Sequence, residues 1–387
     1  MADGHSMSSP ETLVPVAGSE EWKYLDPARF LQDQGPSEER IAVLEEGLVL
    51  HNAQSVLVFE SGSFRADLSR VGEGIDVRAI SAIPEDEIRQ IRPGRFDPAG
   101  PSLHATVLAQ AEDGAFVSVG RDSKAGLVQI LEIGSGPSWS RHVVDVSAGA
   151  SAEIVRMCVT SAKSASVDRS VLECRLGQGA SLEHTLVVDG NAQSASWTGT
   201  VARLERDAKF TSRQFLFGSS VSRAETHVEL QGAGAEADLT GLCAQIGEEI
   251  ADVLTVVRHG APHTVSRQVF QALAGGRSSA SFLGVVQVDR LAQKTSARQS
   301  SRNLLLSREA SVNSRPQLEI WADDVKCSHG STTGRLDEKA LFFLRSRGLS
   351  LESARKLLVR AFASELVELV AREDLRALLE RRLETVL

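Results

Sequence analysis

The chain has 387 residues, of which 42% are hydrophobic and 24% charged, and its net charge is −9 at pH 7. This length allows two or three domains or one elongated unit. The acidic balance argues against a general nucleic-acid binder, and no apolar run approaches the roughly 18 residues that span a membrane. Because residues 1–20 lack a basic segment followed by an apolar one, we expect a cytoplasmic protein without a signal peptide.

The first hundred residues predict a disordered start and a mixed α/β region. Residues 1–20 contain many Gly, Ser and Pro and are expected to be disordered, and the mixed region covers residues 21–100. Within it, residues 37–44 place a serine before an acidic helix-forming run, and residues 55–64 predict a hairpin around a Gly/Ser turn. A cluster of prolines marks a boundary near residue 100: Pro84, Pro93, Pro98 and Pro101.

Residues 101–336 predict a β-solenoid. Short runs of Val, Leu, Ser and Ala alternate with Gly and small polar residues. A loose signature recurs with alanines spaced by 30, 28 and 27 residues: Ala150, Ala180, Ala208 and Ala235. A repeat of this size built from strands and turns is typical of a solenoid, and its natural form is a parallel β-helix. A β-sandwich, which also uses short strands and frequent turns, is the alternative.

Residues 337–387 predict a helical domain. Asp337 is placed to cap a first helix that stops at Gly348, and Ser350 is placed to cap a second, longer helix. Both have apolar residues at helical spacing, and a third amphipathic segment follows over residues 375–383. The apolar stripe suits a cap on the end of the solenoid. We favour an interface, because charged and aromatic residues lie together at 342–348.

One stretch of the core combines a thiol with an imidazole. It is the strand-like run 318–330, at whose end Cys327 and His329 lie two residues apart. Side chains alternate faces along a strand, so the two share one face, and their ligand types suit iron, zinc or sulfur chemistry. Their attachment points are about 6 to 7 Å apart, which is too far for easy chelation of one ion. Either the pair packs at a strand end, or a second chain completes a shared site.

The remaining cysteines and histidines are interpreted as structural. No C-x-x-C occurs, and Cys158, Cys174 and Cys243 are expected to be small buried hydrophobes. His259 and His263 have a zinc-like spacing, but the glycine and proline between them favour a turn.

The sequence lacks the common catalytic motifs that would indicate an enzyme. The sequence contains no phosphate-binding loop, no H-E-x-x-H and no G-x-S-x-G, so we expect neither an ATPase nor a hydrolase. The alternative from a different functional class is a β-helix enzyme that acts on polysaccharide. Its usual rows of acidic or aromatic residues along a groove are not apparent in the sequence.

Three blocks of sequence occur in the order of a known family. They are VRHGAPH at 257–263, AQKT to NLLLS at 292–307, and LEIWADDVKCSHG to LFFLRSRG at 318–348. On these blocks the chain resembles the SufB/SufD family of iron–sulfur cluster assembly proteins, in its SufD branch. The resemblance implies a right-handed parallel β-helix flanked by helical segments. A SufB-like subunit that itself carries the cluster is the alternative within the family, and the small number of cysteines argues against it.

The resemblance also implies partners and site residues. The chain would be a non-catalytic scaffold that binds SufB through the β-helix and the ATPase SufC through the C-terminal helices. His329 is the first candidate ligand at the interface with SufB and Cys327 the second; iron or a nascent iron–sulfur cluster would meet them transiently, and the chain alone would hold no cofactor stably. The isolated chain is expected as a monomer or a homodimer. The residues implied to bind SufC are Leu341, Phe342, Phe343, Arg345, Arg347, Gly348 and Phe362.

Overall fold

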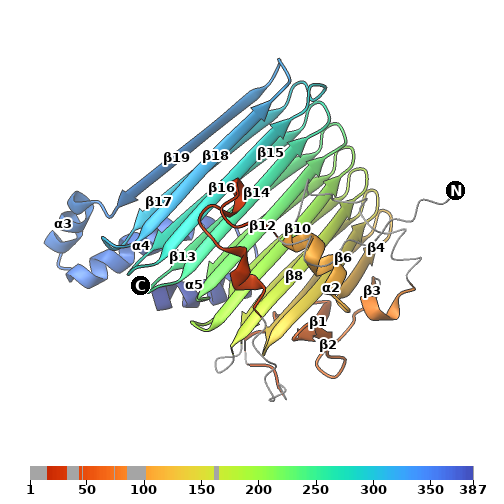
Figure 1. Ribbon diagram of the computed structural model, residues 1–387, viewed down its shortest axis with the longest axis horizontal. Helices are drawn as coiled ribbons and strands as arrows, with labels where there is room; N and C mark the ends of the chain where they lie inside the picture. The colour runs from red at the N-terminus through yellow and green to blue at the C-terminus, as the bar shows by residue number, and fades with distance from the viewer. Residues whose placement is uncertain are drawn as a thin grey trace.

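The core of the protein is a β-solenoid built from two sheets that face each other (Figure 1). The computed structural model describes residues 15–32, 43–45, 47–73, 75–84, 102–160 and 165–386. Sheet A has the order β19-β17-β15-β13-β11-β9-β7-β5-β1-β2, and sheet B has the order β18-β16-β14-β12-β10-β8-β6-β4-β3. From β4 on, the chain alternates between the sheets and completes about seven turns. The prediction of a mostly-β chain with a solenoid core and C-terminal helices is confirmed.

The strands pair in parallel except at the start of the chain, where β1–β2 and β3–β4 are antiparallel. Sheet A contains β1 (Ser55–Glu60), β2 (Ser63–Phe64), β5 (Lys124–Gly134), β7 (Ser151–Thr160), β9 (Ser181–Asp189), β11 (Lys209–Phe217), β13 (Glu236–Gln245), β15 (Val265–Ala274), β17 (Ser296–Leu305) and β19 (Lys326–Arg335). Sheet B contains β3 (Asp76–Ala79), β4 (Ala115–Val119), β6 (Pro137–Val146), β8 (Ser166–Leu176), β10 (Ser194–Leu204), β12 (Val221–Leu230), β14 (Ile250–His259), β16 (Ser279–Val288) and β18 (Ser311–Ile320).

Six successive coils enter sheet A through a corner residue in the left-handed backbone region. These residues have φ between +57° and +74° and precede β7 to β17: Gly149, Gly179, Asp207, Gly234, His263 and Lys294. Glycine adopts this conformation without strain, which explains its frequency at the corners. The residue after each corner is buried, and four of these are the repeated alanines. Their spacing of 30, 28 and 27 residues equals the register of β7, β9, β11 and β13, so the predicted repeat is one coil.

The N-terminal segment 15–32 lies across the outer face of sheet B, in front of the sheet in Figure 1. Its two short turns, η2 (Glu20–Trp22) and η3 (Pro27–Phe30), bury one aromatic ring each. Arg169 of β8 donates a hydrogen bond to the carbonyl of Phe30. Arg223 of β12 donates to the carbonyl of Glu21 at 3.0 Å and lies 3.8 Å from the centre of the Trp22 ring. Buried arginines thus hold the segment in place.

The predicted hairpin over 55–64 is confirmed, with Phe59 of β1 opposite Phe64 of β2. The turn η4 (Ile80–Ala82) follows β3, and α2 (Leu103–Gln110) packs against β6 and β8. Most of the helix predicted at 37–44 lies outside the described residues, as do residues 1–14 of the predicted disordered start and residues 85–101 around the predicted boundary.

Three helices follow the solenoid: α3 (Glu338–Ser346), α4 (Leu351–Val367) and α5 (Glu373–Val386). The predicted caps are confirmed, because Asp337 accepts from the Lys339 N–H at 2.8 Å, Ser350 accepts from the Ser353 N–H at 3.0 Å, and Gly348 has φ +95°. None of the described helices is long and apolar enough to cross a membrane.

The two longer helices cover the outer face of sheet A, behind the sheet in Figure 1. Buried residues of α4 and α5, such as Leu366 and Leu379, pack on apolar side chains of several strands, such as Val155, Phe215 and Leu273. The helices therefore lie along a side of the solenoid. The interpretation of the tail as an end cap is wrong, because the outer face of sheet A is itself apolar and needs this cover.

Candidate functional site

Cys327 and His329 lie near the start of β19, the last strand of sheet A. The sequence predicts a single strand-like run over 318–330 with the pair at its end. The structure instead ends β18 at Ile320, forms a corner over residues 321–325 and begins β19 at Lys326. The prediction that the pair ends a strand is therefore wrong: the solenoid crosses between its sheets just before it.

Both side chains belong to the face of β19 that points toward the solenoid interior. Cys327 is opposite Ala297 of β17 and packs with the interior cluster that contains Ala297 and Val286. Burial raises the pKa of the Cys327 thiol. His329 is opposite Gln299, yet it is exposed, because no further coil of the described chain covers this end.

The end of the solenoid at β18 and β19 is uncovered in the described part of the chain. Each strand is the last of its sheet, and Figure 1 shows them at the upper left edge. All residues of β19 are exposed except Cys327, which is half-buried. Among the described residues, each edge presents a row of backbone N–H and C=O groups without strand partners, and such edges are templates for strands of another chain.

The pair supplies two ligand types of the kind found in iron and zinc sites. Soft metal sites and iron–sulfur clusters usually take four protein ligands. Within the described residues, no group of three or more His, Cys, Asp or Glu side chains is arranged to hold a metal ion. The three other cysteines are buried, as predicted: Cys158, Cys174 and Cys243.

His259 and His263 do not converge on one site. His259 is buried at the end of β14, where its ring nitrogens lie 2.8 Å from the Thr264 hydroxyl and 2.9 Å from the Ser266 hydroxyl. His263 is an exposed corner residue with φ +60°. Burial lowers the pKa of His259 to about 4. The structural interpretation of both residues agrees with this arrangement.

We expect His259→Gln to reduce the acid sensitivity of the fold. The buried imidazole stays neutral in the folded chain but takes up a proton below about pH 6.5 once the chain unfolds. Its contribution to stability is complete above that pH and is lost as the pH falls toward 4. Urea unfolding at a series of pH values should show a shallower loss for His259→Gln, whereas His263→Asn should keep the original slope. Equal slopes for all three proteins would contradict this expectation.

A buried ionic cluster in the first coils was not predicted. Glu132 of β5 accepts from the Cys158 thiol at 3.1 Å, faces Nε2 of His142 at 3.2 Å and lies 3.7 Å from Nε of Arg156. Burial alone would raise the pKa of Glu132, but His142 and Arg156 hold it well below its usual range. The four residues come from both sheets and share no motif, so only the paired strands bring them together. Their mutual contacts indicate a structural role.

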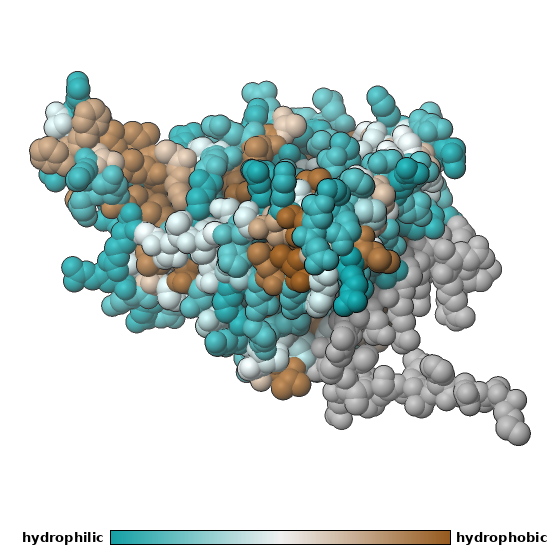
Figure 2. Space-filling view, turned by 90° about the horizontal axis from the view of Figure 1, so that it is seen from above, coloured by the Kyte–Doolittle hydropathy of each residue, from teal (hydrophilic) through white to brown (hydrophobic). Residues whose placement is uncertain are grey.

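The helix α3 carries an exposed aromatic surface beyond the far end of β19. The side chains of Phe342 and Phe343 are 74% and 56% exposed, and the guanidinium of Arg347 lies 5.3 Å from the centre of the Phe343 ring. Figure 2 shows hydrophobic surface at the end of the molecule where α3 projects. Leu341 is buried, and Phe362 is half-buried against the apolar cluster under α4 and α5. The other residues of the predicted surface are exposed: Arg345 and Gly348.

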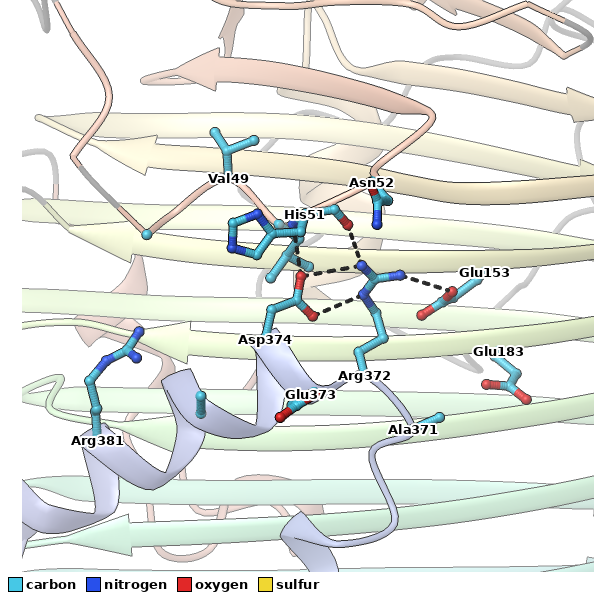
Figure 3. A pocket seen from close by; sticks show the side chains of 13 residues that line it. Val49, His51, Asn52, Glu153, Glu183, Ala371, Arg372, Glu373, Asp374 and Arg381 are labelled. Carbon is cyan, nitrogen blue, oxygen red and sulfur yellow. Dashed lines mark hydrogen bonds and ion pairs between the residues drawn. The ribbon is translucent and has the colours of Figure 1, made fainter.

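A pocket of about 840 Å³ lies where residues 47–52 meet sheet A and α5 (Figure 3). Arg372 donates to Asp374 at 3.2 Å, contacts the carbonyl of His51 and lies 3.7 Å from Glu153. The His51 N–H donates to Asp374 at 2.7 Å. These groups bind one another and join three segments of the chain, so we interpret the pocket as a structural joint. It is separate from Cys327 and His329.

Comparisons with known proteins agree with one another. Residues 131–362 match the family model described as SUF system FeS cluster assembly, SufBD core domain. The chain is 30% identical over 385 residues to the iron–sulfur cluster assembly protein SufD of Escherichia coli (strain K12), across 97% of this chain and 90% of that protein. It is 34% identical over 207 residues to protein ABCI7, chloroplastic, of Arabidopsis thaliana, and 28% identical over 162 residues to SufD of Bacillus subtilis (strain 168). These two matches cover 53% and 42% of this chain, and 44% and 37% of the relatives.

The fold and the site together define a parallel β-solenoid protein that presents a thiol–imidazole pair at an uncovered end. The family model covers more than half of the chain, and the similarity to the E. coli protein extends over nearly all of it. The chain belongs to the SufB/SufD family and, within it, to the SufD branch. The resemblance carried by the three sequence blocks is confirmed.

Proposed function

We propose that this chain is a SufD-like, non-catalytic scaffold subunit of the SUF iron–sulfur cluster assembly complex. The observation that carries the proposal is the uncovered end of the solenoid, where His329 and Cys327 stand beside two free sheet edges. The relatives named SufD support the assignment. In this role the chain works in the cytoplasm, binds SufB and the ATPase SufC, and contributes to iron acquisition and to formation of the nascent cluster.

SufB binds at the uncovered end. The edges of β18 and β19 offer backbone hydrogen bonds to strands of a partner, and strand addition of this kind gives affinity without large apolar side chains. A second solenoid of the same family has sheets of matching spacing. In the absence of SufB, the same edges can pair with a second copy of this chain.

Iron or the nascent cluster is cargo at this interface and not a resident cofactor of the chain. The exposed imidazole of His329 is the first ligand, because it is accessible to a metal held by the partner. The thiol of Cys327 is the second, because it is half-buried and burial disfavours its thiolate. SufB supplies the remaining thiolate or carboxylate ligands.

SufC binds at the surface formed by α3 and the adjoining turn. Exposed aromatic and arginine side chains are frequent in the energetic centres of interfaces. Helix α4, against which α3 packs, is in turn joined to the sheet that carries the cargo site. Glu365 of α4 forms an ion pair with Arg302 of β17 and accepts from Gln271 of β15 at 3.3 Å, and β17 pairs with β19. Closure of SufC on ATP binding would therefore pull on the sheet that carries His329.

Co-purification of the partners with the unmodified chain, and with a variant whose β19 edge is blocked, tests this function. We expect the tagged chain to bring down untagged SufB and SufC from the same organism. The Lys326 N–H donates to the carbonyl of Thr295, the residue just before β17, so by alternation the Ser331 N–H points away from the sheet. Ser331→Pro, which removes that donor, should lose SufB and keep SufC, whereas Ser331→Ala should keep both. The proposal would be refuted if Ser331→Pro still brought down SufB, or if the unmodified tagged chain brought down neither partner.

A further inference from the structure

A column of buried polar side chains runs through the solenoid interior toward the uncovered end. Five residues on facing strands, each no more than 4% exposed, form this polar column: Gln214, Thr226, Thr255, Gln268 and Gln299. Gln214 donates to Thr226 at 2.6 Å, and Thr255 donates to Oε1 of Gln268 at 2.6 Å. Thr226 and Thr255 lie opposite each other on β12 and β14, so the two hydrogen-bonded pairs adjoin.

Gln299 is the last member of the column, and two contacts fix its amide. Its Nε2 donates to Oε1 of Gln268 at 3.4 Å. The amide also lies against the backbone of Gly284 in sheet B, where an added Cβ would come within 1.8 Å of Nε2. Because the nitrogen points into the column, the oxygen is left for another donor. Oε1 of Gln299 is buried and has no hydrogen-bond partner among the described residues.

His329 is the next residue in the same row. Gln268, Gln299 and His329 lie opposite one another on β15, β17 and β19, and residues in register on parallel strands point to the same side. Neighbouring strands are about 4.8 Å apart, which places an imidazole N–H within reach of the amide oxygen. A buried acceptor without a donor costs stability, so this hydrogen bond is favourable.

We propose that Gln299 is a positioning residue for His329. When the exposed ring of His329 turns toward the solenoid interior, Oε1 of Gln299 accepts the proton of one ring nitrogen. This hydrogen bond fixes the tautomer and the ring plane, and it directs the lone pair of the other nitrogen out of the uncovered end. Histidines that bind metals generally donate their second ring N–H to such an acceptor. The inference rests on the proposed role of His329 as an iron ligand, and it assigns the interior of the solenoid a part in preparing that ligand.

Nitrogen NMR of the full chain labelled with ¹⁵N-histidine tests the positioning directly. At mildly alkaline pH, the His329 signals, identified by their absence in His329→Ala, should show one protonated and one unprotonated nitrogen. In Gln299→Leu, the two signals should move toward the average of both tautomers. Gly284→Ala should have the same effect, because its methyl group displaces the amide. Gln271→Leu is the matched control, since that buried glutamine faces α4 instead.

Unchanged His329 signals in both Gln299→Leu and Gly284→Ala, or mixed tautomers in the unmodified chain, would overturn the inference. A second readout separates it from the proposed function. In the complex with SufB and SufC, Gln299→Leu should weaken iron binding about 10- to 100-fold. If the tautomer responds to Gln299 but His329→Ala leaves the iron content unchanged, the positioning stands and the proposed iron-binding role of His329 fails.

Discussion

Replacing Phe342 with aspartate should strongly weaken binding of SufC to this chain while the fold remains intact. The ring is 74% exposed, so its removal costs little stability in the isolated protein. In the complex, the carboxylate would be buried without a counter-charge, which is strongly unfavourable. We expect a loss of more than about 2 kcal/mol, or roughly 30-fold in Kd, as is typical of residues at interface centres.

Calorimetric titration of SufC into the chain measures this effect. Leu291→Asp is a matched control, because Leu291 is 79% exposed in the turn before β17, at the opposite end of the strands from α3. It should bind SufC as the unmodified chain does. Deletion of the helices would be a poor test, because it would strip the apolar cover from sheet A. Unchanged affinity of Phe342→Asp would remove α3 from the proposed interface.

The coils of the solenoid could be predicted because successive coils repeat the same backbone conformation at their corners. A left-handed corner and a small buried residue recur before every sheet A strand from β7 to β17, and Gly149–Ala150 and Gly179–Ala180 show both in the sequence. Later corners use His263 and Lys294, followed by threonine. The alanine signature therefore fades although the coils continue. Helix caps were equally predictable, since capping by Asp337 and Ser350 depends on local sequence alone.

The features that could not be predicted depend on which strands face each other. The corner between β18 and β19 could not be predicted, because Trp321 to Val325 contain no glycine or proline to mark it. The sequence there therefore looks like one continuous strand. The packing of α4 and α5 on sheet A could be predicted only by knowing that the outer face of this sheet is apolar. The row formed by Gln268, Gln299 and His329 is visible in the sequence only once the register of 31 and 30 residues is known.

Replacing His329 with alanine should deprive the complex of iron without disturbing its assembly. The side chain is exposed, so thermal stability and binding of SufB and SufC should remain nearly unchanged. A neutral imidazole can bind iron, but a methyl group cannot. Cys327→Ser should have a weaker effect, because that thiol also packs with the interior cluster around Ala297.

The most direct test of the shared site is the iron and sulfide content of the purified complex after anaerobic cluster assembly. We predict that the complex with His329→Ala holds much less iron and acid-labile sulfide than the unmodified complex, at equal subunit stoichiometry. The complex with His263→Asn, a change at an exposed corner away from β19, should match the unmodified one. If His329→Ala complexes mature clusters at the unmodified rate and yield, the site at the uncovered end is structural and the account is wrong.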